Sequence, residues 1–270
     1  MTPKEKILSR LQKGLHICVG LDSDINKIPK HLLNDENAIL NFNKEIIEKT
    51  HDIAAAYKIN FAFYEKEGEN GFKLLAKTLN LIPNDILVIG DAKRGDIGNT
   101  SEMYAQAMFD HFKLDSSTLN PYMGYDSLSP FINYKENIHF ILALTSNPGS
   151  FDFEKLELTN GKKVYQEVIT KVNQWNSNNN LGIVFGATNL DELKENIQNF
   201  ENLFVLLPGV GAQGGDLEAI VTAFKENSNS NFLINVSRTL IYADNTEKFA
   251  SESRKVLEGY NEIIEKTLNN

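Results

Sequence analysis

Cysteine is nearly absent from this chain, which has one in 270 residues. That residue, Cys18, cannot form an internal disulfide, and its place in an apolar run indicates a small core residue. No stretch of about 18 apolar residues occurs, so we expect no membrane span. Residues 1–12 are polar and charged and lack the apolar core of a signal peptide. Together these absences predict a cytoplasmic protein.

Positive charge is also in short supply. Lysine and arginine number 27 against 36 aspartates and glutamates, which gives a net charge of −9 at pH 7. A general nucleic-acid binder or a protein of anionic membranes would normally carry a basic face, so we expect neither partner. The histidines do not share the spacing of metal ligands, so we expect no metal site. Positive charge that binds an anionic ligand must therefore be local.

Short apolar runs are present along the whole chain, and segments with helical periodicity lie between them. Strands that alternate with helices predict a parallel sheet, and roughly 250 residues is the usual size of a (β/α)8 barrel. An open doubly wound sheet is the alternative, disfavoured because no G-x-G-x-x-G follows the first run. We therefore predict an α/β fold, a (β/α)8 TIM barrel, as a single domain over residues 1–270. The apolar runs are His16–Asp22, Ala55–Tyr64, Ile86–Lys93, Ser117–Tyr122, His139–Ser146, Leu181–Thr188, Phe204–Val210 and Phe232–Arg238, and the clearest helical segments are Ala38–Thr50 and Thr246–Ile264.

The sequence Asp91-Ala92-Lys93-Arg94-Gly95-Asp96 closes the third run. Alternation along a strand places Asp91 and Lys93 on the same side. Charge is costly to bury without a partner, so two carboxylates and an ammonium at a strand end indicate chemistry. The alternative is a surface loop with ordinary ion pairs, or a helix start with Asp96 near its N-cap. A lysine between carboxylates suits a proton donor, whereas a Schiff-base lysine needs a neutral amine.

Glycines gather in the segment Pro208–Asp216, which follows the seventh run. Glycine permits a positive φ and close backbone approach, and such loops cradle phosphates. A plain flexible turn is the alternative. Arg238 ends the eighth run, and the loops after strands seven and eight form the usual phosphate site of this barrel. Because arginine offers bidentate donors, we expect Arg238 to bind a phosphate rather than to form a surface salt bridge.

Further polar residues fall at strand ends, where this barrel carries its site. Lys58 is either an edge-strand side chain that reaches solvent or a residue paired inside a site. Asp22 could instead cap a helix, and Ser146 could cap a loop. Asp96 and Thr100 are spaced i, i+4, so on one helix they would face the same way. A pair that points away from its own pocket could serve the pocket of a neighbouring subunit.

These segments together resemble orotidine 5'-phosphate decarboxylase, and most closely its bacterial type 2 subfamily. The resemblance spans nearly the whole chain. Its most specific part is Asp91-x-Lys93-x-x-Asp96, followed by Ile97-Gly98-Asn99-Thr100. The other matching segments are Val19–Asp22, Lys58–Glu65, Leu142–Gly149, Pro208–Asp216 and Ser237-Arg238.

The resemblance implies decarboxylation of orotidine 5'-monophosphate to UMP and carbon dioxide, the last step of pyrimidine nucleotide synthesis. It also implies a homodimer without metal or organic cofactor. By the same resemblance, Lys93 would donate a proton to C6, Asp91 would face the departing carboxylate, and Lys58 would hold Asp91 and the ribose. Asp96 and Thr100 would enter the partner subunit's site. The remaining substrate contacts would be Asp22 to a ribose hydroxyl, Ser146 to the pyrimidine edge, Gln213 to the phosphate and base, Arg238 to the phosphate, and Pro208 at the start of the same loop.

Other functions remain as alternatives. Related sugar-phosphate synthases and decarboxylases share Asp-x-Lys-x-x-Asp but use Mg²⁺, and a Schiff-base aldolase would use a neutral lysine. A non-catalytic nucleotide-binding barrel would bind UMP without turnover. A scaffold protein would not need lysines and acids together at strand ends.

Overall fold

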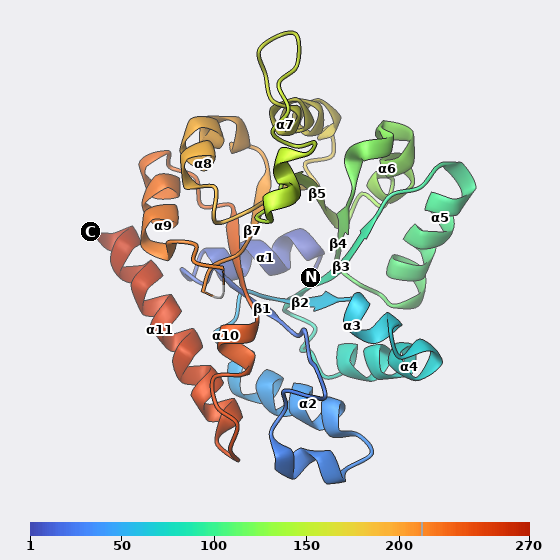
Figure 1. The fold of residues 1–270 in the computed structure, drawn as a ribbon, viewed down its shortest axis with the longest axis vertical. Coiled ribbons are helices and arrows are strands. Elements are labelled where there is room, and N and C mark those ends of the chain that lie inside the picture. The colour runs from blue at the N-terminus through green and yellow to red at the C-terminus, as the bar shows by residue number, and fades with distance from the viewer. Residues whose placement is uncertain (212) are drawn as a thin grey trace.

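The computed structural model describes residues 1–211 and 213–270. Eight parallel strands form one closed barrel in chain order, and β8 returns to pair with β1. Figure 1 looks into the barrel and shows helices around the strands. The predicted (β/α)8 barrel is confirmed. The strands are β1 (Ile17–Gly20), β2 (Ala56–Asn60), β3 (Leu87–Arg94), β4 (Ser116–Leu119), β5 (Ile138–Leu144), β6 (Leu181–Phe185), β7 (Phe204–Pro208) and β8 (Phe232–Val236).

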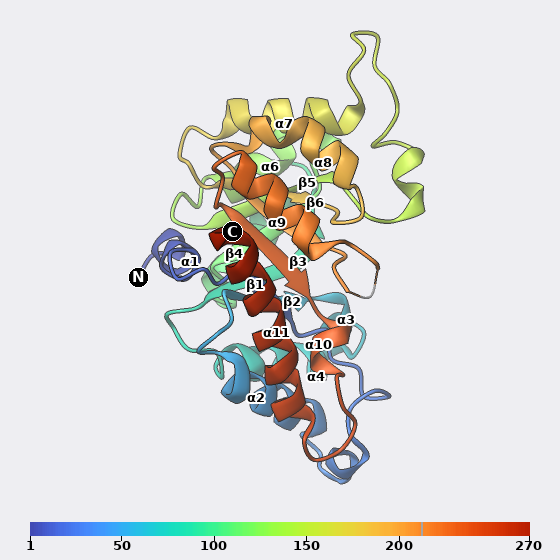
Figure 2. The same cartoon turned by 90° about the vertical axis from the view of Figure 1, so that its left-hand side faces the viewer.

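Helices connect the strands and cover the outside of the barrel (Figures 1 and 2). A long excursion, residues 145–163, separates β5 from α7 and extends beyond the barrel rim in both views. The α-helices are α1 (Pro3–Leu11), α2 (Ala38–Thr50), α3 (Ala62–Glu65), α4 (Gly68–Leu79), α5 (Gly98–Gln106), α6 (Tyr125–Ile132), α7 (Val164–Trp175), α8 (Leu190–Asn196), α9 (Leu217–Glu226), α10 (Arg238–Ile241) and α11 (Phe249–Asn269). Shorter helical turns are η1 (Lys30–Asn34), η2 (Ala107–His111), η3 (Pro121–Met123), η4 (Pro148–Phe151) and η5 (Ile197–Phe200).

Most of the strands are apolar, because a parallel sheet is buried on both faces, and the exceptions are β4 and the charged end of β3. Side chains such as Leu87, Phe140 and Leu233 fill the lower part of the barrel interior. Cys18 belongs to the same cluster, which confirms the core prediction, and burial raises the pKa of its thiol to about 12. Each predicted apolar run overlaps one strand of the barrel, and β3, β4 and β5 extend one residue beyond the predicted run.

The two helical segments expected from periodicity differ in how well their ends agree with the structure. Ala38–Thr50 is α2 with the same limits. The second segment was expected to begin at Thr246, but α11 begins at Phe249 and continues to Asn269. The cause is local, because the Asp244 carboxylate accepts hydrogen bonds from the backbone N–H and the hydroxyl of Thr246. That turn keeps Thr246 outside the helix.

Helix α1 closes the amino-terminal end of the barrel. Its Ile7 and Leu11 pack on the apolar barrel interior. Lys6 Nζ also lies 2.8 Å from Asp115 Oδ1, and Arg10 donates to the backbone carbonyls of residues 51, 52 and 54. Figure 2 shows α1 on the opposite side of the barrel from α10. The carboxyl ends of the strands are therefore the end left open for a site.

No helix within the described ranges is both long enough and apolar enough to cross a membrane.

Candidate active site

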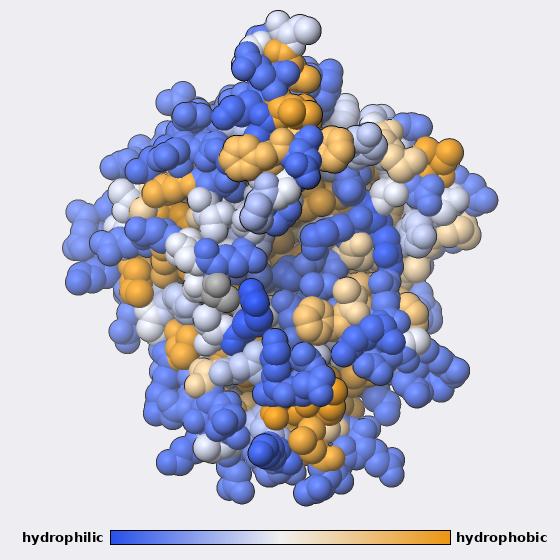
Figure 3. All heavy atoms as spheres, in the orientation of Figure 1, coloured by the Kyte–Doolittle hydropathy of each residue, from blue (hydrophilic) through white to orange (hydrophobic). Residues whose placement is uncertain are grey.

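A cavity of about 320 Å³ opens at the carboxyl ends of the strands. Figure 3 shows a hollow with a hydrophilic floor at the centre of this face. Eight of the ten site residues predicted from sequence line the cavity, and Asp96 and Thr100 do not. The eight are Asp22, Lys58, Asp91, Lys93, Ser146, Pro208, Gln213 and Arg238.

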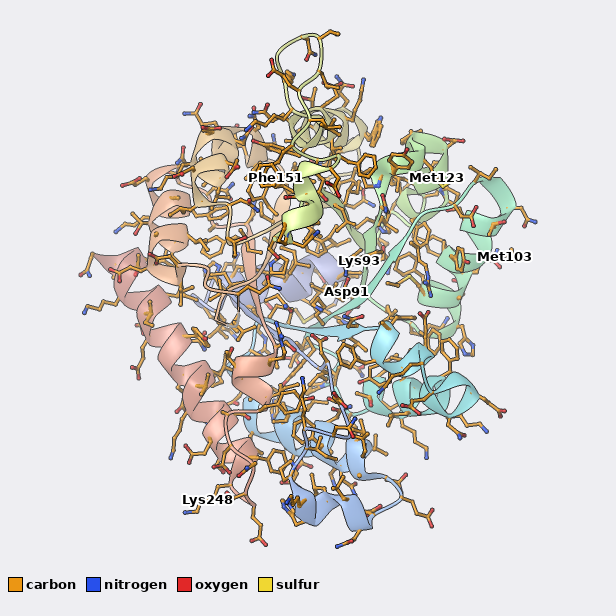
Figure 4. All side chains as sticks on the ribbon, viewed as in Figure 1. Asp91, Lys93, Met103, Met123, Phe151 and Lys248 are labelled. Carbon is orange, nitrogen blue, oxygen red and sulfur yellow. The ribbon has the colours of Figure 1, made fainter. Side chains whose placement is uncertain are left out.

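Asp91 is the centre of a charged array on the cavity wall. Its Oδ1 lies 2.7 Å from Lys93 Nζ, and its Oδ2 lies 2.8 Å from Lys58 Nζ. The Thr118 hydroxyl donates a third hydrogen bond, 2.9 Å long, to Asp91 Oδ1. Figure 4 shows Asp91 and Lys93 together at the barrel mouth. All three charged residues line the cavity, but Lys58 and Asp91 are buried in its wall whereas 49% of the Lys93 side chain is exposed, so Lys93 is the most accessible group of the array.

Burial and charge act in opposite directions on the pKa values of this array. Desolvation alone would raise the pKa of Asp91, but Lys58 and Lys93 outweigh it and hold that pKa well below its usual range. Desolvation alone would lower the pKa of Lys58, but Asp22 and Asp91 outweigh it and raise that pKa. Asp91 and Lys58 are therefore both charged at neutral pH.

The backbone at Lys93 departs from regular strand geometry. Its φ is +48°, in the left-handed region that non-glycine residues rarely adopt. The register between β3 and β4 also shifts between Gly90 and Arg94. The Lys93 N–H is satisfied by the Thr118 hydroxyl at 3.0 Å, which is the same hydroxyl that bonds Asp91. Thr118 thus holds both the backbone of Lys93 and its carboxylate partner, and such local strain is common at active sites.

Asp22 follows β1 and faces Lys58. The distance from its Oδ1 to Lys58 Nζ is 3.7 Å. This oxygen is buried and has no hydrogen-bond partner among the described residues. The next helical turn begins only at Lys30, so the helix-cap interpretation of Asp22 is wrong. A buried acceptor without a donor is costly, and a ligand hydroxyl in the cavity would satisfy it.

The glycine-rich loop after β7 brings Gln213 to the cavity. The Ser146 hydroxyl, which follows β5, donates to Gln213 Oε1 at 2.6 Å. Gly209 has a φ of +114°, and a Cβ there would lie 2.9 Å from the same oxygen. The backbone conformation therefore favours glycine at 209, and a Cβ there would push the Gln213 side chain aside. Residue 212 of this loop lies outside the described residues.

Arg238 is the first residue of α10 and lines the cavity. Within the part of the chain that the structure describes, its guanidinium forms no ion pair. The surface salt-bridge interpretation is therefore not supported. Arg238 lines the same cavity as the glycine-rich loop.

Asp96 and Thr100 lie outside the cavity of their own chain. Helix α5 begins at Gly98, so Asp96 precedes it and does not share a helical face with Thr100 as the spacing suggested. Instead, Asp96 Oδ1 accepts a hydrogen bond from the Ile97 N–H at 2.8 Å. Thr100 is exposed on the first turn of α5. The loop that leaves β3 thus carries both residues away from Lys93 without pairing them.

Sequence reasoning missed several polar residues of the cavity. Thr118 lies in the predicted fourth run, and with the two residues before it forms three consecutive hydroxyl residues, 116–118, an unusual composition for a buried strand. Asn60, within a segment noted for Lys58, and Asn235 on β8 also line the cavity. Alternation with Lys58 could have identified Asn60, and alternation with Ser237 could have identified Asn235.

The histidines take no part in the site. His16 and His139 are buried, and desolvation lowers the pKa of each to about 4. Within residues 1–211 and 213–270, no three His, Cys, Asp or Glu side chains are grouped so that they could hold a metal ion.

Comparison with known proteins gives a consistent family. The family model described as "Orotidine 5'-phosphate decarboxylase / HUMPS family" matches residues 16–252. Orotidine 5'-phosphate decarboxylase of Porphyromonas gingivalis is 46% identical over 256 residues, which are 94% of this chain and 92% of that protein. The structure of Leishmania donovani OMP decarboxylase matches with a TM-score of 0.82 and 34% identity, over 98% of this chain and 99% of that one.

A second solved structure, that of Leishmania donovani UMP synthase, matches with a TM-score of 0.85 and 36% identity. The match covers 98% of this chain but 57% of that protein, so the chain spans little more than half of the synthase. Both the family model and the relatives cover most of the chain, and the range that the family model matches includes every residue of the cavity lining. The chain therefore belongs to the orotidine 5'-phosphate decarboxylase / HUMPS family.

Proposed function

We propose that this chain converts orotidine 5'-monophosphate to UMP and carbon dioxide, in pyrimidine nucleotide synthesis and without a cofactor. The observation that carries the proposal is the array Lys58–Asp91–Lys93, in a cavity that also holds Arg238. An anionic substrate with a carboxylate at one end and a phosphate at the other matches these charges. A relative of this name is also 46% identical to the chain over 256 residues.

Lys93 is the proposed proton donor. Loss of carbon dioxide leaves a carbanion at C6 of the pyrimidine, and a fixed ammonium stabilises that charge as it develops. The electron pair of the broken C–CO₂ bond stays on C6 and takes a proton from Lys93 Nζ. The 2.7 Å contact with Asp91 supports this role, because it fixes the ammonium at the cavity wall.

Asp91 is proposed to face the carboxylate of the substrate. Its pKa is held low by Lys58 and Lys93, so it is ionised when the substrate binds. Two carboxylates side by side repel each other, and the repulsion ends as carbon dioxide leaves. Lys58 holds Asp91 in place and, with Asp22, is the proposed contact for the ribose hydroxyls.

The far end of the substrate is proposed to bind between β5, β7 and β8. Gln213 and Arg238 would hold the phosphate beside Pro208, and Ser146 would bind the pyrimidine edge. The Ser146–Gln213 hydrogen bond supports a connection between the base and the phosphate loop. Binding energy from a remote phosphate can hold the base against the repulsion at Asp91.

We also infer a homodimer in which Asp96 and Thr100 complete the partner's cavity. Neither residue lines the cavity of its own chain. Exposed apolar side chains occur in the same part of the chain, and Met103 and Met123 lie on the side of the molecule that carries α5 and α6 (Figure 4). Apolar surface of this kind is typical of protein interfaces. The exposed apolar residues there are Ile97, Met103, Tyr104, Tyr122 and Met123.

Turnover after treatment with EDTA tests the proposal. The purified protein should convert orotidine 5'-monophosphate to UMP, followed by the change in ultraviolet absorbance. Loss of activity on chelation, with Mg²⁺-dependent turnover of a sugar phosphate, would instead indicate the metal-using branch. UMP binding without turnover would indicate a binding protein, and a lysine adduct trapped by borohydride would indicate an aldolase.

Cell fractionation tests the cytoplasmic location predicted from sequence.

A further inference from the structure

The hydroxyl of Tyr242 joins two segments that are far apart in sequence. It donates a hydrogen bond to the Asp22 carbonyl at 3.0 Å and accepts one from the Asp24 N–H at 2.7 Å. One hydroxyl thus clamps the backbone on both sides of Ser23, directly after β1. Tyr242 itself follows α10, the helix that begins with Arg238.

A second hydrogen bond fastens the other end of the same helix. Ser237 precedes Arg238, and its hydroxyl donates to the Gly20 carbonyl at 3.1 Å. A Cβ at Gly20 would lie 2.8 Å from the Ser237 Cβ, so the two segments are in close contact. Hydrogen bonds therefore connect both ends of α10 to the carboxyl end of β1 and the residues after it. Arg238 lies between the two hydrogen-bonding residues, Ser237 and Tyr242.

Aromatic stacking fixes the Tyr242 ring and so fixes the position of its hydroxyl. It stacks on Phe42 of α2 with ring centroids 5.7 Å apart, and Phe42 stacks on Phe249 at 5.0 Å. Burial raises the pKa of Tyr242 to about 12, so the hydroxyl stays protonated near neutral pH. It can therefore donate and accept at the same time.

We propose that Tyr242 is a positioning residue that couples Arg238 at the phosphate end of the cavity to Asp22 at the ribose end. The inference rests on the proposed function. The Asp22 Oδ1 has no hydrogen-bond partner among the described residues and only a 3.7 Å ion pair with Lys58, so its place in the cavity depends largely on its own main chain. Tyr242 holds that main chain, and α10 holds Tyr242. A phosphate that fixes Arg238 would then also fix Asp22, and coupling of this kind is reciprocal.

A double-mutant cycle tests the coupling. Tyr242→Phe keeps the stacked ring and removes both hydrogen bonds of the hydroxyl. It should lower kcat/KM for orotidine 5'-monophosphate by about 10-fold, with much of the loss in kcat at saturating substrate. In a chain that already carries Arg238→Ala, the same substitution should cost less than about 2-fold, because the phosphate contact to be coupled is gone. Ser237→Ala removes the hydrogen bond to the Gly20 carbonyl, and its effect on kcat/KM should likewise be smaller when Arg238 is already replaced.

Tyr134→Phe is the matched control, because the Tyr134 hydroxyl bonds the exposed Asp110 and lies outside the cavity lining. It should leave kcat/KM unchanged in both backgrounds. An equal loss from Tyr242→Phe with and without Arg238 would overturn the coupling, since a purely structural role predicts that result. No loss in either background would also overturn it. If the native chain does not turn over the substrate, the proposed function fails instead, so the two failures are distinguishable.

Discussion

A single carboxylate, that of Asp91, binds two ammonium groups and the hydroxyl of Thr118. Its native pKa lies below that of the unfolded chain, where an aspartate has a pKa of about 3.9. The ionised group therefore stabilises the fold above that unfolded value, and the contribution is lost as the pH falls through the native pKa. Acid thus removes stability from the same residue that the proposed reaction needs in its charged form.

Replacing Lys58 by methionine should destabilise the fold by about 3 kcal/mol at neutral pH. The change leaves Asp22 and Asp91 buried with less compensating charge, so the pKa of Asp91 should rise. The difference in free energy of unfolding between the native chain and the variant should shrink as the pH falls towards about 4. Asp91 becomes protonated at higher pH in the variant than in the native chain, and protonation removes its uncompensated buried charge. Urea denaturation at several pH values measures this.

Lys171→Met is the control for that substitution. Lys171 pairs with Glu167 at 3.7 Å, and 46% of its side chain is exposed. Such a pair should contribute less than about 1 kcal/mol. If Lys58→Met loses no more stability than Lys171→Met, or if its loss of stability does not change with pH, the charges of the buried array do not stabilise the fold as proposed.

Replacing Arg238 by alanine should mainly weaken binding of the phosphorylated substrate, because the lost guanidinium faces the proposed phosphate site. We expect KM to rise by at least about 10-fold, the cost of losing one charged hydrogen-bonding partner. Steady-state kinetics with orotidine 5'-monophosphate and with its phosphate-free analogue measures this. Lys248→Ala is the control, because Figure 4 shows Lys248 far from the barrel mouth. Equal losses on both substrates would contradict the phosphate role.

The loop after β7 illustrates how an element can be functional through its backbone. Gly209→Ala should lower kcat/KM by more than about 10-fold, because a Cβ there would displace Gln213 from Ser146. Gly161→Ala is the matched control. Gly161 also has a positive φ, +79°, but no atom lies within 4 Å of its Cβ position. Both variants should lose about 1 kcal/mol of stability from the left-handed conformation, and only the first should lose activity. If both glycine variants lose activity, backbone strain anywhere in the chain is enough to explain the loss, and displacement of Gln213 is not needed.

The elements themselves could largely be predicted from the sequence, because buried strands are apolar and helices repeat every 3.6 residues. Every predicted run overlaps a strand to within one residue at the ends where it falls short, and α2 has the predicted limits. The ends were less predictable where a side chain competes with the helix, as Asp244 does before α11. The start of α5 after Asp96 likewise depends on the loop rather than on periodicity.

Strand order alone brings most of the predicted site residues to one cavity. The side chains of Asp91 and Lys93 do meet in an ion pair, as alternation along a strand predicts. The left-handed backbone of Lys93 could not be predicted from alternation. The role of Thr118 could not be predicted, because it depends on the register shift between β3 and β4. Tyr242 was missed for a similar reason, since its contacts join α10 to the segment after β1.

At the scale of the whole molecule, one end of the barrel is closed by α1 and the other carries the cavity. Asp96 and Thr100 lie at the open end but outside the cavity, so a partner subunit is the proposed place for their function. The barrel supplies a rigid frame, while the complete site would need two copies. A single domain over residues 1–270 remains a prediction, which one cooperative unfolding transition would support.

Mixing two inactive variants tests the shared site. Lys93→Ala and Asp96→Ala should each have little activity alone. After they are unfolded and refolded together, mixed dimers would contain one cavity with both residues intact. Random pairing then predicts about a quarter of the native activity. No recovery, although mixed dimers form as shown by tagged subunits, would mean that Asp96 acts within its own chain.

The most direct test of the account is turnover of orotidine 5'-monophosphate by the native chain and by Lys93→Ala, both treated with EDTA and both shown to be folded by thermal melting. The account predicts one UMP for each substrate consumed by the native chain, and a rate lower by more than about 1,000-fold in the variant, since both the charge and the proton donor are lost. A native chain that makes no UMP, or a variant that stays within about 10-fold of the native rate, would contradict the account, because lost acid catalysis alone exceeds that.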